Sequence, residues 1–157
     1  EEEAAVDGNL KSSSVANLVR KMGTESVVIS GKIESEVSFL SEENEKLEYL
    51  ESIGLAEPGL SRVIRAGYSL LELITFFTTG PSETRAWTIP SGAKSPEAAG
   101  AIHSDFERGF IKAETISFDD FIKFNGEHGA KEAGKMRQEG KEYEVSDGDV
   151  MHFKFNV

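Results

Sequence analysis

Apolar and polar positions follow their clearest pattern in the second half of the chain. Residues 73–78 and 84–90 are rich in β-branched and aromatic side chains, and a Gly-Pro turn separates them, which predicts two strands. A Ser-Pro pair, typical of a helix N-terminus, opens a run in which apolar side chains recur at helical spacing, and this predicts one helix over 95–108. We therefore expect two strands followed by one main helix.

The pattern continues with further strands after this helix. The predicted elements are a strand over 111–117, a short helix over 130–137, and strands over 143–145 and 150–156. The last two strands flank Asp147-Gly148, a strong signal for a tight hairpin. Residues 72–157 thus hold about five strands around one main helix, which predicts an α+β fold of the ubiquitin-like β-grasp type.

Residues 1–71 are patterned more weakly and predict a separate, mostly helical unit. The apolar run SVVIS at 26–30 lies between two glycines and predicts a short strand. Residues 32–40 fit either a helix or a loop. Further helices are predicted over 15–22, from Ser41 to Gly54, and from Pro58 to about residue 71.

Composition supports a folded chain and limits its partners. Hydrophobic residues make up 38% of the 157 residues and include ten Phe, enough for a real core. No apolar run approaches the roughly 20 residues of a membrane span, and the lack of Cys excludes disulfides and thiolate metal sites. The net charge of −11 counts against nonspecific binding to nucleic acid, although it leaves room for a local basic patch.

The sequence lacks the patterns that nucleotide hydrolysis and metal catalysis require. Neither GxxxxGK[ST] nor GxGxxG occurs, so a triphosphate has no cradle. The three His show no HExxH spacing, and the consecutive His103, Ser104 and Asp105 point in different directions on a helix, so they cannot form a triad. We expect no catalytic residue, no metal site and no cofactor in this chain itself.

Two groups of side chains are candidates for binding a partner. Trp87 most simply fills the core, but the alternative is a stacking platform for a base or a peptide. Arg85 falls on the same face of the strand, and its head can reach the rim of the core. The tightest basic cluster consists of Lys131, Lys135, Arg137 and Lys141, and its acidic neighbours favour the alternative of a solvated surface.

Several longer segments together resemble one protein family. SGKIE, with Ser30, Gly31 and Lys32, follows the predicted strand at 26–30, and RAWTI, AAGAIHSDFERGFI, EAGKMR and DGDVMHFKFN follow later in this order. These segments resemble the C-terminal part of the YchF-type (Obg-like) P-loop ATPases, which contains a TGS domain. In that family, a loop similar to SGKIE binds the nucleotide base through backbone N–H groups.

The resemblance implies a domain organisation. Residues 72–157 would be the TGS β-grasp domain, and residues 1–71 the C-terminal remnant of a nucleotide-binding, G-like domain. The phosphate loop, both switch regions and the Asn-x-x-Glu base motif should lie upstream of this chain. We expect residues 1–58 to be partly disordered or rearranged on their own, because a truncated α/β fragment exposes sheet edges and apolar faces.

The resemblance also implies a function. Full-length members are ATPases or GTPases that use ATP or GTP with Mg and associate with ribosomes. Our leading hypothesis is a non-catalytic, monomeric region, in the cytoplasm or an organelle stroma such as that of plastids. Its TGS domain would bind the ribosome or RNA and couple this to nucleotide binding in the full-length protein. The alternative is a protein–protein adaptor of ubiquitin-like fold without nucleic-acid binding. Residual nucleotide hydrolysis has only the SGKIE loop in its favour.

Overall fold

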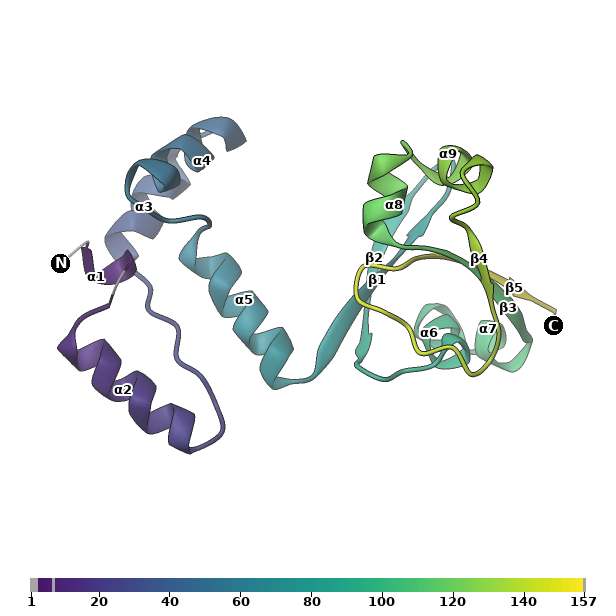
Figure 1. The fold of residues 1–157 in the computed structure, drawn as a ribbon, viewed down its shortest axis with the longest axis horizontal. Coiled ribbons are helices and arrows are strands. Elements are labelled where there is room, and N and C mark those ends of the chain that lie inside the picture. Colours follow the sequence, from purple (N-terminus) through teal and green to yellow (C-terminus); the bar gives the residue numbers. More distant parts are fainter. Residues whose placement is uncertain (1–2, 7, 157) are drawn as a thin grey trace. The chain divides into compact units, whose positions relative to one another are not determined.

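The computed structural model describes residues 3–6 and 8–156 and separates into two compact units, Glu1–Leu70 and Leu71–Val157 (Figure 1). The first unit is helical. Its elements are α1 (Glu3–Val6), α2 (Leu10–Lys21), α3 (Gly31–Phe39), α4 (Glu43–Ser52) and α5 (Gly59–Leu70). A small core of Ala5, Ile33, Val37, Leu50 and Leu55 joins α1, α3 and α4.

The local signals of the first unit decide where its helices begin. Asn9 accepts hydrogen bonds from the backbone N–H groups of Lys11 and Ser12, so α2 starts earlier than the helix predicted over 15–22. The segment at 32–40, for which helix and loop were both open, is helical. The helix predicted to start with a Ser41 cap begins at Glu43 instead, after Glu42, whose side chain makes no capping hydrogen bond.

The strand predicted at 26–30 was wrong. Residues 24–30 run without regular secondary structure, and no described strand pairs with them. A strand is stabilised by the ladder to its neighbour, so an apolar β-branched run without a partner remains irregular.

The second unit is built around one five-stranded sheet. Its elements are β1 (Leu73–Thr79), β2 (Thr84–Pro90), α6 (Ser95–Ile102), α7 (Ser104–Arg108), β3 (Phe110–Ile116), α8 (Phe118–Lys123), α9 (Glu127–Glu132), β4 (Arg137–Glu139) and β5 (Val150–Phe155). The strand order is β2-β1-β5-β3-β4, in which β1 and β5 are parallel and the other neighbours antiparallel. The fold is therefore a mixed α/β arrangement with the two ends of the unit's chain paired at the centre of the sheet.

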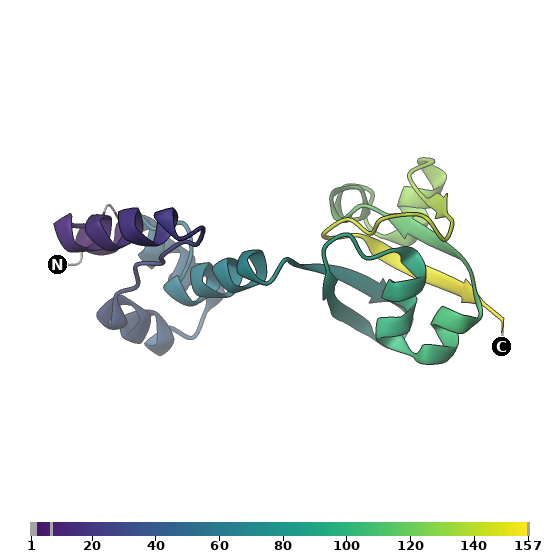
Figure 2. The same ribbon diagram turned by 90° about the horizontal axis from the view of Figure 1, so that it is seen from below.

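The main core lies between this sheet and α6. Phe76 and Phe153 meet edge to face at 5.9 Å, and Ala98 and Ala99 of α6 are fully buried against them. α8 covers part of the opposite face, since the ring of Phe118 lies 6.0 Å from that of Phe77, whose side chain points away from the α6 side. Figures 1 and 2 show α6 and α8 on opposite sides of β1.

Three sequence predictions for the second unit were wrong in detail. The helix expected over 95–108 is broken at His103, whose backbone is extended and whose imidazole Nδ1 accepts from the N–H of Asp105 to cap α7. The helix expected over 130–137 lies earlier, as α9, and residues 137–139 form β4. The strand at 143–145 is a loop with one isolated bridge, between Glu144 and Lys94.

Residues 143–145 do not pair with β5 as predicted, because β5 already pairs with two other strands. It lies between β1 and β3, and so has no free edge for a hairpin mate. The Asp147-Gly148 turn is instead tied to β1: the N–H of Thr75 donates to Asp147 Oδ1 at 2.7 Å, and the N–H of Gly148 donates to the carbonyl of Thr75 at 2.8 Å.

Candidate functional site

The clearest binding feature of the second unit is a cation held over an aromatic ring on β2. Arg85 and Trp87 share one face of this strand, and the guanidinium carbon of Arg85 lies 4.3 Å from the centre of the Trp87 ring. The indole Nε1 donates to Thr78 Oγ1 at 2.9 Å, and the ring stacks on Phe76 at 6.5 Å. Trp87 is thus anchored in the rim of the core, and it serves as a platform for Arg85.

Arg85 keeps its hydrogen-bonding capacity. The side chain is exposed, and within the part of the chain that the structure describes it forms no ion pair. A guanidinium that an aromatic ring holds in place loses less entropy when it binds a phosphate, a carboxylate or a base. This pair therefore presents a preorganised cation at the edge of the sheet.

The basic cluster predicted from the sequence lies elsewhere, and carboxylates face two of its cations. Arg137 is on β4, at the sheet edge opposite to β2. Its Nε lies 3.2 Å from Glu139 Oε1, while Lys135 Nζ lies 3.9 Å from Asp120 Oδ1. Lys131 is exposed on α9. The structure thus does not bring these three cations to the Arg85–Trp87 pair.

Arg137 also belongs to a buried hydrogen-bond network that the sequence did not indicate. Asp149 is only 2% exposed, and its carboxylate accepts from the phenol of Tyr143 at 2.7 Å, from the N–H of Ser146 at 3.0 Å and from Arg137 Nη2 at 3.4 Å. Burial raises the pKa of Tyr143, and the hydrogen bond to Asp149 raises it further. This network fixes the loop before β5 and gives Arg137 a structural role.

The SGKIE segment forms the start of α3. The hydroxyl of Ser30 accepts from the N–H of Ile33 at 3.4 Å, and Lys32 Nζ lies 3.8 Å from Glu36 on the next turn. Gly31 has open space on the side where a Cβ would stand. The carboxylate of Glu34 accepts from the N–H of Gly59 at 2.7 Å, and so caps α5.

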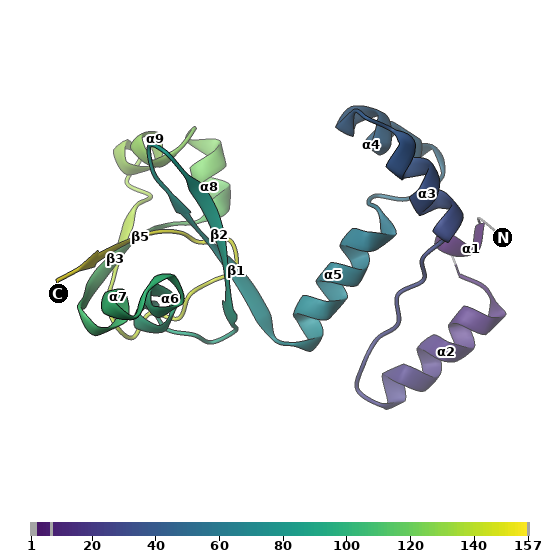
Figure 3. The same ribbon diagram turned by 180° about the vertical axis from the view of Figure 1, so that it is seen from behind.

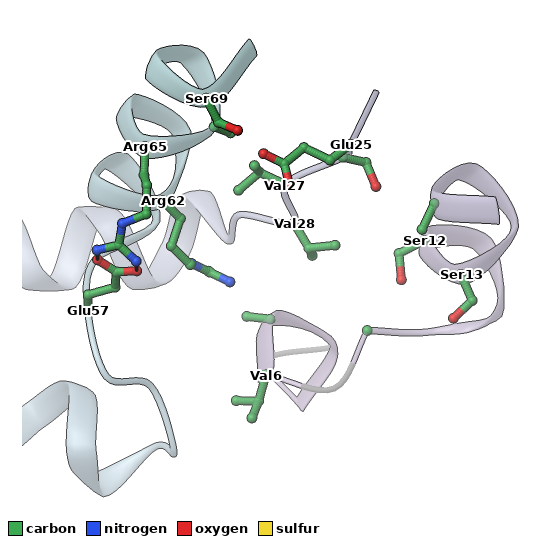
Figure 4. Close-up of a pocket in the computed structure, with 15 residues that line it drawn as sticks. Val6, Ser12, Ser13, Glu25, Val27, Val28, Glu57, Arg62, Arg65 and Ser69 are labelled. Atoms are coloured by element: carbon green, nitrogen blue, oxygen red, sulfur yellow. Dashed lines mark hydrogen bonds and ion pairs between the residues drawn. The ribbon is translucent and has the colours of Figure 1, made fainter. Parts of the chain in front are cut away.

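A cavity of about 610 Å³ opens within the first unit (Figure 4). Its walls come from α1, α2, the segment at 25–28 and α5, and they do not include Ser30, Gly31 or Lys32. The Arg62 side chain extends into it, and the neighbouring Arg65 is held by Glu57 through two hydrogen bonds, at 2.8 and 2.7 Å. The pocket and the SGKIE segment are therefore separate features.

Across residues 3–6 and 8–156, no group of three or more His, Cys, Asp or Glu side chains is arranged to hold a metal ion. Within the same ranges, each helix is too short or too polar to cross a bilayer.

Comparison with known proteins places the chain in a family. Residues 73–156 match the family YchF-GTPase_C, described as "Protein of unknown function (DUF933)". The chain belongs to this YchF family. Among its relatives is the "Ribosome-binding ATPase YchF" of Haemophilus influenzae, 59% identical over 143 residues, or 91% of this chain and 39% of that protein. The resemblance found in the sequence is confirmed.

Relatives in more distant organisms give the same picture. The "Ribosome-binding ATPase YchF" of Bacillus subtilis is 52% identical over all of this chain and 43% of its own length. The "Obg-like ATPase 1" of Xenopus laevis is 50% identical over 83% of this chain and 33% of its own length. The chain thus spans about two fifths of the YchF proteins that it matches.

Solved structures agree with the fold. The Schizosaccharomyces pombe YchF GTPase superimposes with a TM-score of 0.71 and 35% identity, covering 83% of this YchF-family chain and 34% of the other. A GTP-binding protein from Pyrococcus horikoshii OT3 matches with a TM-score of 0.64 over 99% of this chain and 44% of its own. At 18% identity, the second likeness concerns the fold alone.

Proposed function

We propose that residues 72–157 are a TGS domain of the β-grasp type and that residues 1–71 are the end of a nucleotide-binding domain. The strand order β2-β1-β5-β3-β4, with α6 packed across one face, supports the β-grasp assignment. The family match over residues 73–156 begins close to the boundary between the two compact units. Both observations favour a division of the chain at residues 71–72.

This TGS domain docks the longer protein onto the ribosome. Relatives are named ribosome-binding ATPases, and the single observation that carries the proposal here is the exposed Arg85 guanidinium held over Trp87. Such a pair suits an RNA phosphate beside a stacked base. Because the chain is acidic overall, the contact has to be local rather than a general attraction to RNA. Lys131, Lys135 and Arg137 are secondary candidates, since carboxylates already face two of them.

The chain itself is non-catalytic in this proposal. ATP or GTP with Mg would act in the longer protein, where docking is coupled to nucleotide binding. Ser30, Gly31 and Lys32 stay our candidates for the base-binding loop, supported by their place at the start of α3 and the open space beside Gly31. Because the chain lacks a phosphate-binding loop, the free energy of nucleotide binding is less favourable by about 1.5–3 kcal/mol for each charged hydrogen bond that such a loop would make.

Cosedimentation with ribosomes tests the docking role. We expect Arg85→Glu to reduce pelleting of the chain about tenfold, the effect of one or more lost charged hydrogen bonds. Lys123→Glu is the matched control, because it makes the same charge change at an exposed position of the second unit outside the candidate residues. Equal pelleting of both variants, or no pelleting of the parent chain, would remove the support. In a parallel titration, micromolar binding of fluorescent ATP to this chain would contradict the non-catalytic assignment.

A further inference from the structure

The outer edge of β2 carries open backbone groups. Hydrogen bonds at the two ends of the β1–β2 pair set its hydrogen-bonding phase: the N–H of Gly80 donates to the carbonyl of Glu83, and the N–H of Ser91 donates to the carbonyl of Glu72. Hydrogen-bonded and non-hydrogen-bonded residue pairs alternate along an antiparallel ladder. The backbone groups of Arg85, Trp87 and Ile89 therefore bond to β1. The backbone groups of Thr84 and Ala86 therefore point away from the sheet.

The hydrogen bonds on the other side of β1 agree with this phase. Phe77 and Thr75, the residues of opposite phase on β1, bond to the other side, to the carbonyl of Asp149 and the N–H of Gly148. Within residues 71–156, no strand pairs with β2 on its outer side. The edge ends at Pro90, which has no N–H to offer a further strand. A short stretch around Ala86 is thus the accessible part of this edge.

An apolar strip lies beside this stretch on the α8 face of the sheet. Ala86 is exposed and pairs across the ladder with Phe77, whose ring meets Phe118. Phe118 is 48% exposed, and Ile122, one turn further along α8, is 60% exposed. Figure 3 shows α8 next to the β1–β2 pair. An added strand would place every second side chain on the side of this strip.

The other face of the same edge is cationic. Arg85 lies on the opposite side of β2 from Ala86, and its guanidinium has no ion pair with a described residue. The intervening side chains of an added strand would point to this side. An acidic side chain there would complete a charged pair, whereas an apolar one would leave the guanidinium uncompensated.

We propose that the β2 edge binds an extended peptide in which apolar and acidic residues alternate, as an added antiparallel strand. Apolar side chains lie toward Phe77 and Phe118, and an acidic side chain meets Arg85. RNA has no backbone that continues a β ladder. A second copy paired around Ala86 would bring Trp87 opposite Arg85 and no carboxylate. The edge therefore fits such a peptide better than either of these.

The hydrogen-bonding phase of β2 decides which backbone N–H groups of the peptide bond to the protein. In an antiparallel pair, the residues bonded to Ala86 have side chains on the same face as Ala86. These are the apolar residues of the peptide. Their N–H groups bond to β2, while those of the acidic residues point to solvent. A peptide N-methylated at its apolar residues should therefore bind more weakly than one N-methylated at its acidic residues.

The experiment uses the full chain and a fluorescein-labelled octapeptide of alternating Val and Glu, followed by anisotropy. We expect saturable binding of this peptide and about tenfold weaker binding of a Val4Glu4 block peptide. Binding should also be about tenfold weaker when the Val amides are N-methylated, since each lost hydrogen bond is worth about 1 kcal/mol. N-methylation of the Glu amides should leave binding within about twofold. Equal affinity for the alternating and block peptides, or no binding, would overturn the proposal.

Variants of the protein complete the test. Ala86→Pro removes the outward N–H without touching the bonds to β1 and should weaken binding about tenfold, whereas Ala86→Thr keeps the N–H and should bind as the parent. Unfolding midpoints establish that both variants are folded. Self-association that Ala86→Pro abolishes would assign the edge to a second copy and overturn the peptide proposal. Ribosome pelleting through Arg85 and RNA should be unchanged by Ala86→Pro, so the two proposals fail separately.

Discussion

The phenol of Tyr143 donates a 2.7 Å hydrogen bond to the buried carboxylate of Asp149, and the two residues tie the loop before β5 to the strand itself. Arg137 on β4 and the backbone N–H of Ser146 complete the set of donors around this carboxylate. A buried charge is tolerated only when such partners compensate for its lost hydration. The network therefore links β4 to the loop before β5 through one buried carboxylate.

The Asp149 carboxylate should be the most sensitive polar group of the second unit. We expect Asp149→Asn to lower the free energy of unfolding by about 1.5–3 kcal/mol, because an amide of similar size loses the charged hydrogen bonds. Tyr143→Phe, which removes only one donor, should cost about 1 kcal/mol. Urea unfolding of both variants measures the difference. An Asp149→Asn chain as stable as the parent would show that the network does not stabilise the fold.

Alkaline pH should weaken the fold through Tyr143. Its pKa is raised by burial and by Asp149, so the folded state favours the protonated phenol. That contribution is complete below the pKa of a free tyrosine, about 10, and is lost as pH rises through the higher folded pKa. We expect the tyrosinate absorbance that is lost in Tyr143→Phe to titrate above the pKa of a free tyrosine. A difference between the two chains that titrates at the pKa of a free tyrosine would contradict the assignment.

Gly109 should be intolerant of a side chain. A Cβ at this position would overlap the backbone of Asn156, whose N–H donates to the Gly109 carbonyl at 2.9 Å. Since backbone atoms cannot give way as a flexible side chain does, we expect Gly109→Ala to cost about 1–3 kcal/mol in thermal or urea unfolding. Gly140→Ala is the matched control, because no atom lies within 4 Å of a Cβ there. Similar losses in both variants would indicate a general effect of removing glycine.

The first unit should exchange its amides faster than the second when this chain stands alone. Its core is small, and many apolar side chains of α2 and α5 are exposed. Glu34 holds the start of α5 through Gly59, so Glu34→Ala should speed exchange over 59–70 and leave 71–156 unchanged. Hydrogen exchange with mass spectrometry measures both. Uniformly slow exchange from residue 15 onward would contradict the expected mobility.

Some elements could be predicted from the sequence because their signals are local. Pro58 marks the start of α5, and β-branched and aromatic runs mark β1 and β2, since each of these signals acts within a few residues. Alternation along one strand predicted that Arg85 and Trp87 share a face, but it did not predict the contact between the guanidinium and the ring. Thr78, the hydrogen-bond partner of Trp87, was missed, although it is the residue opposite Arg85 in the ladder.

Other features could not be predicted because they depend on residues far apart in the chain. The same apolar run is a strand only where a neighbour pairs with it, which is why residues 26–30 are irregular and the Asp147-Gly148 turn serves β1 rather than a hairpin. The burial of Asp149 likewise follows from β5 lying between β1 and β3. An Asp beside a turn is ordinarily solvated, so its sequence context favoured the wrong environment.

Taken by itself, the amino-acid sequence determined the family, the α+β character of residues 72–157 and the absence of a phosphate-binding motif in this chain. These follow from residue types and short spacings. Only the tertiary structure decided that Lys135 and Arg137 are paired with carboxylates, that Arg85 lies over Trp87 without an ion pair among the described residues, and that the edge at Ala86 is open. The physical reason is that ion pairing and strand pairing are set by distances across the sheet, which separation along the chain does not encode.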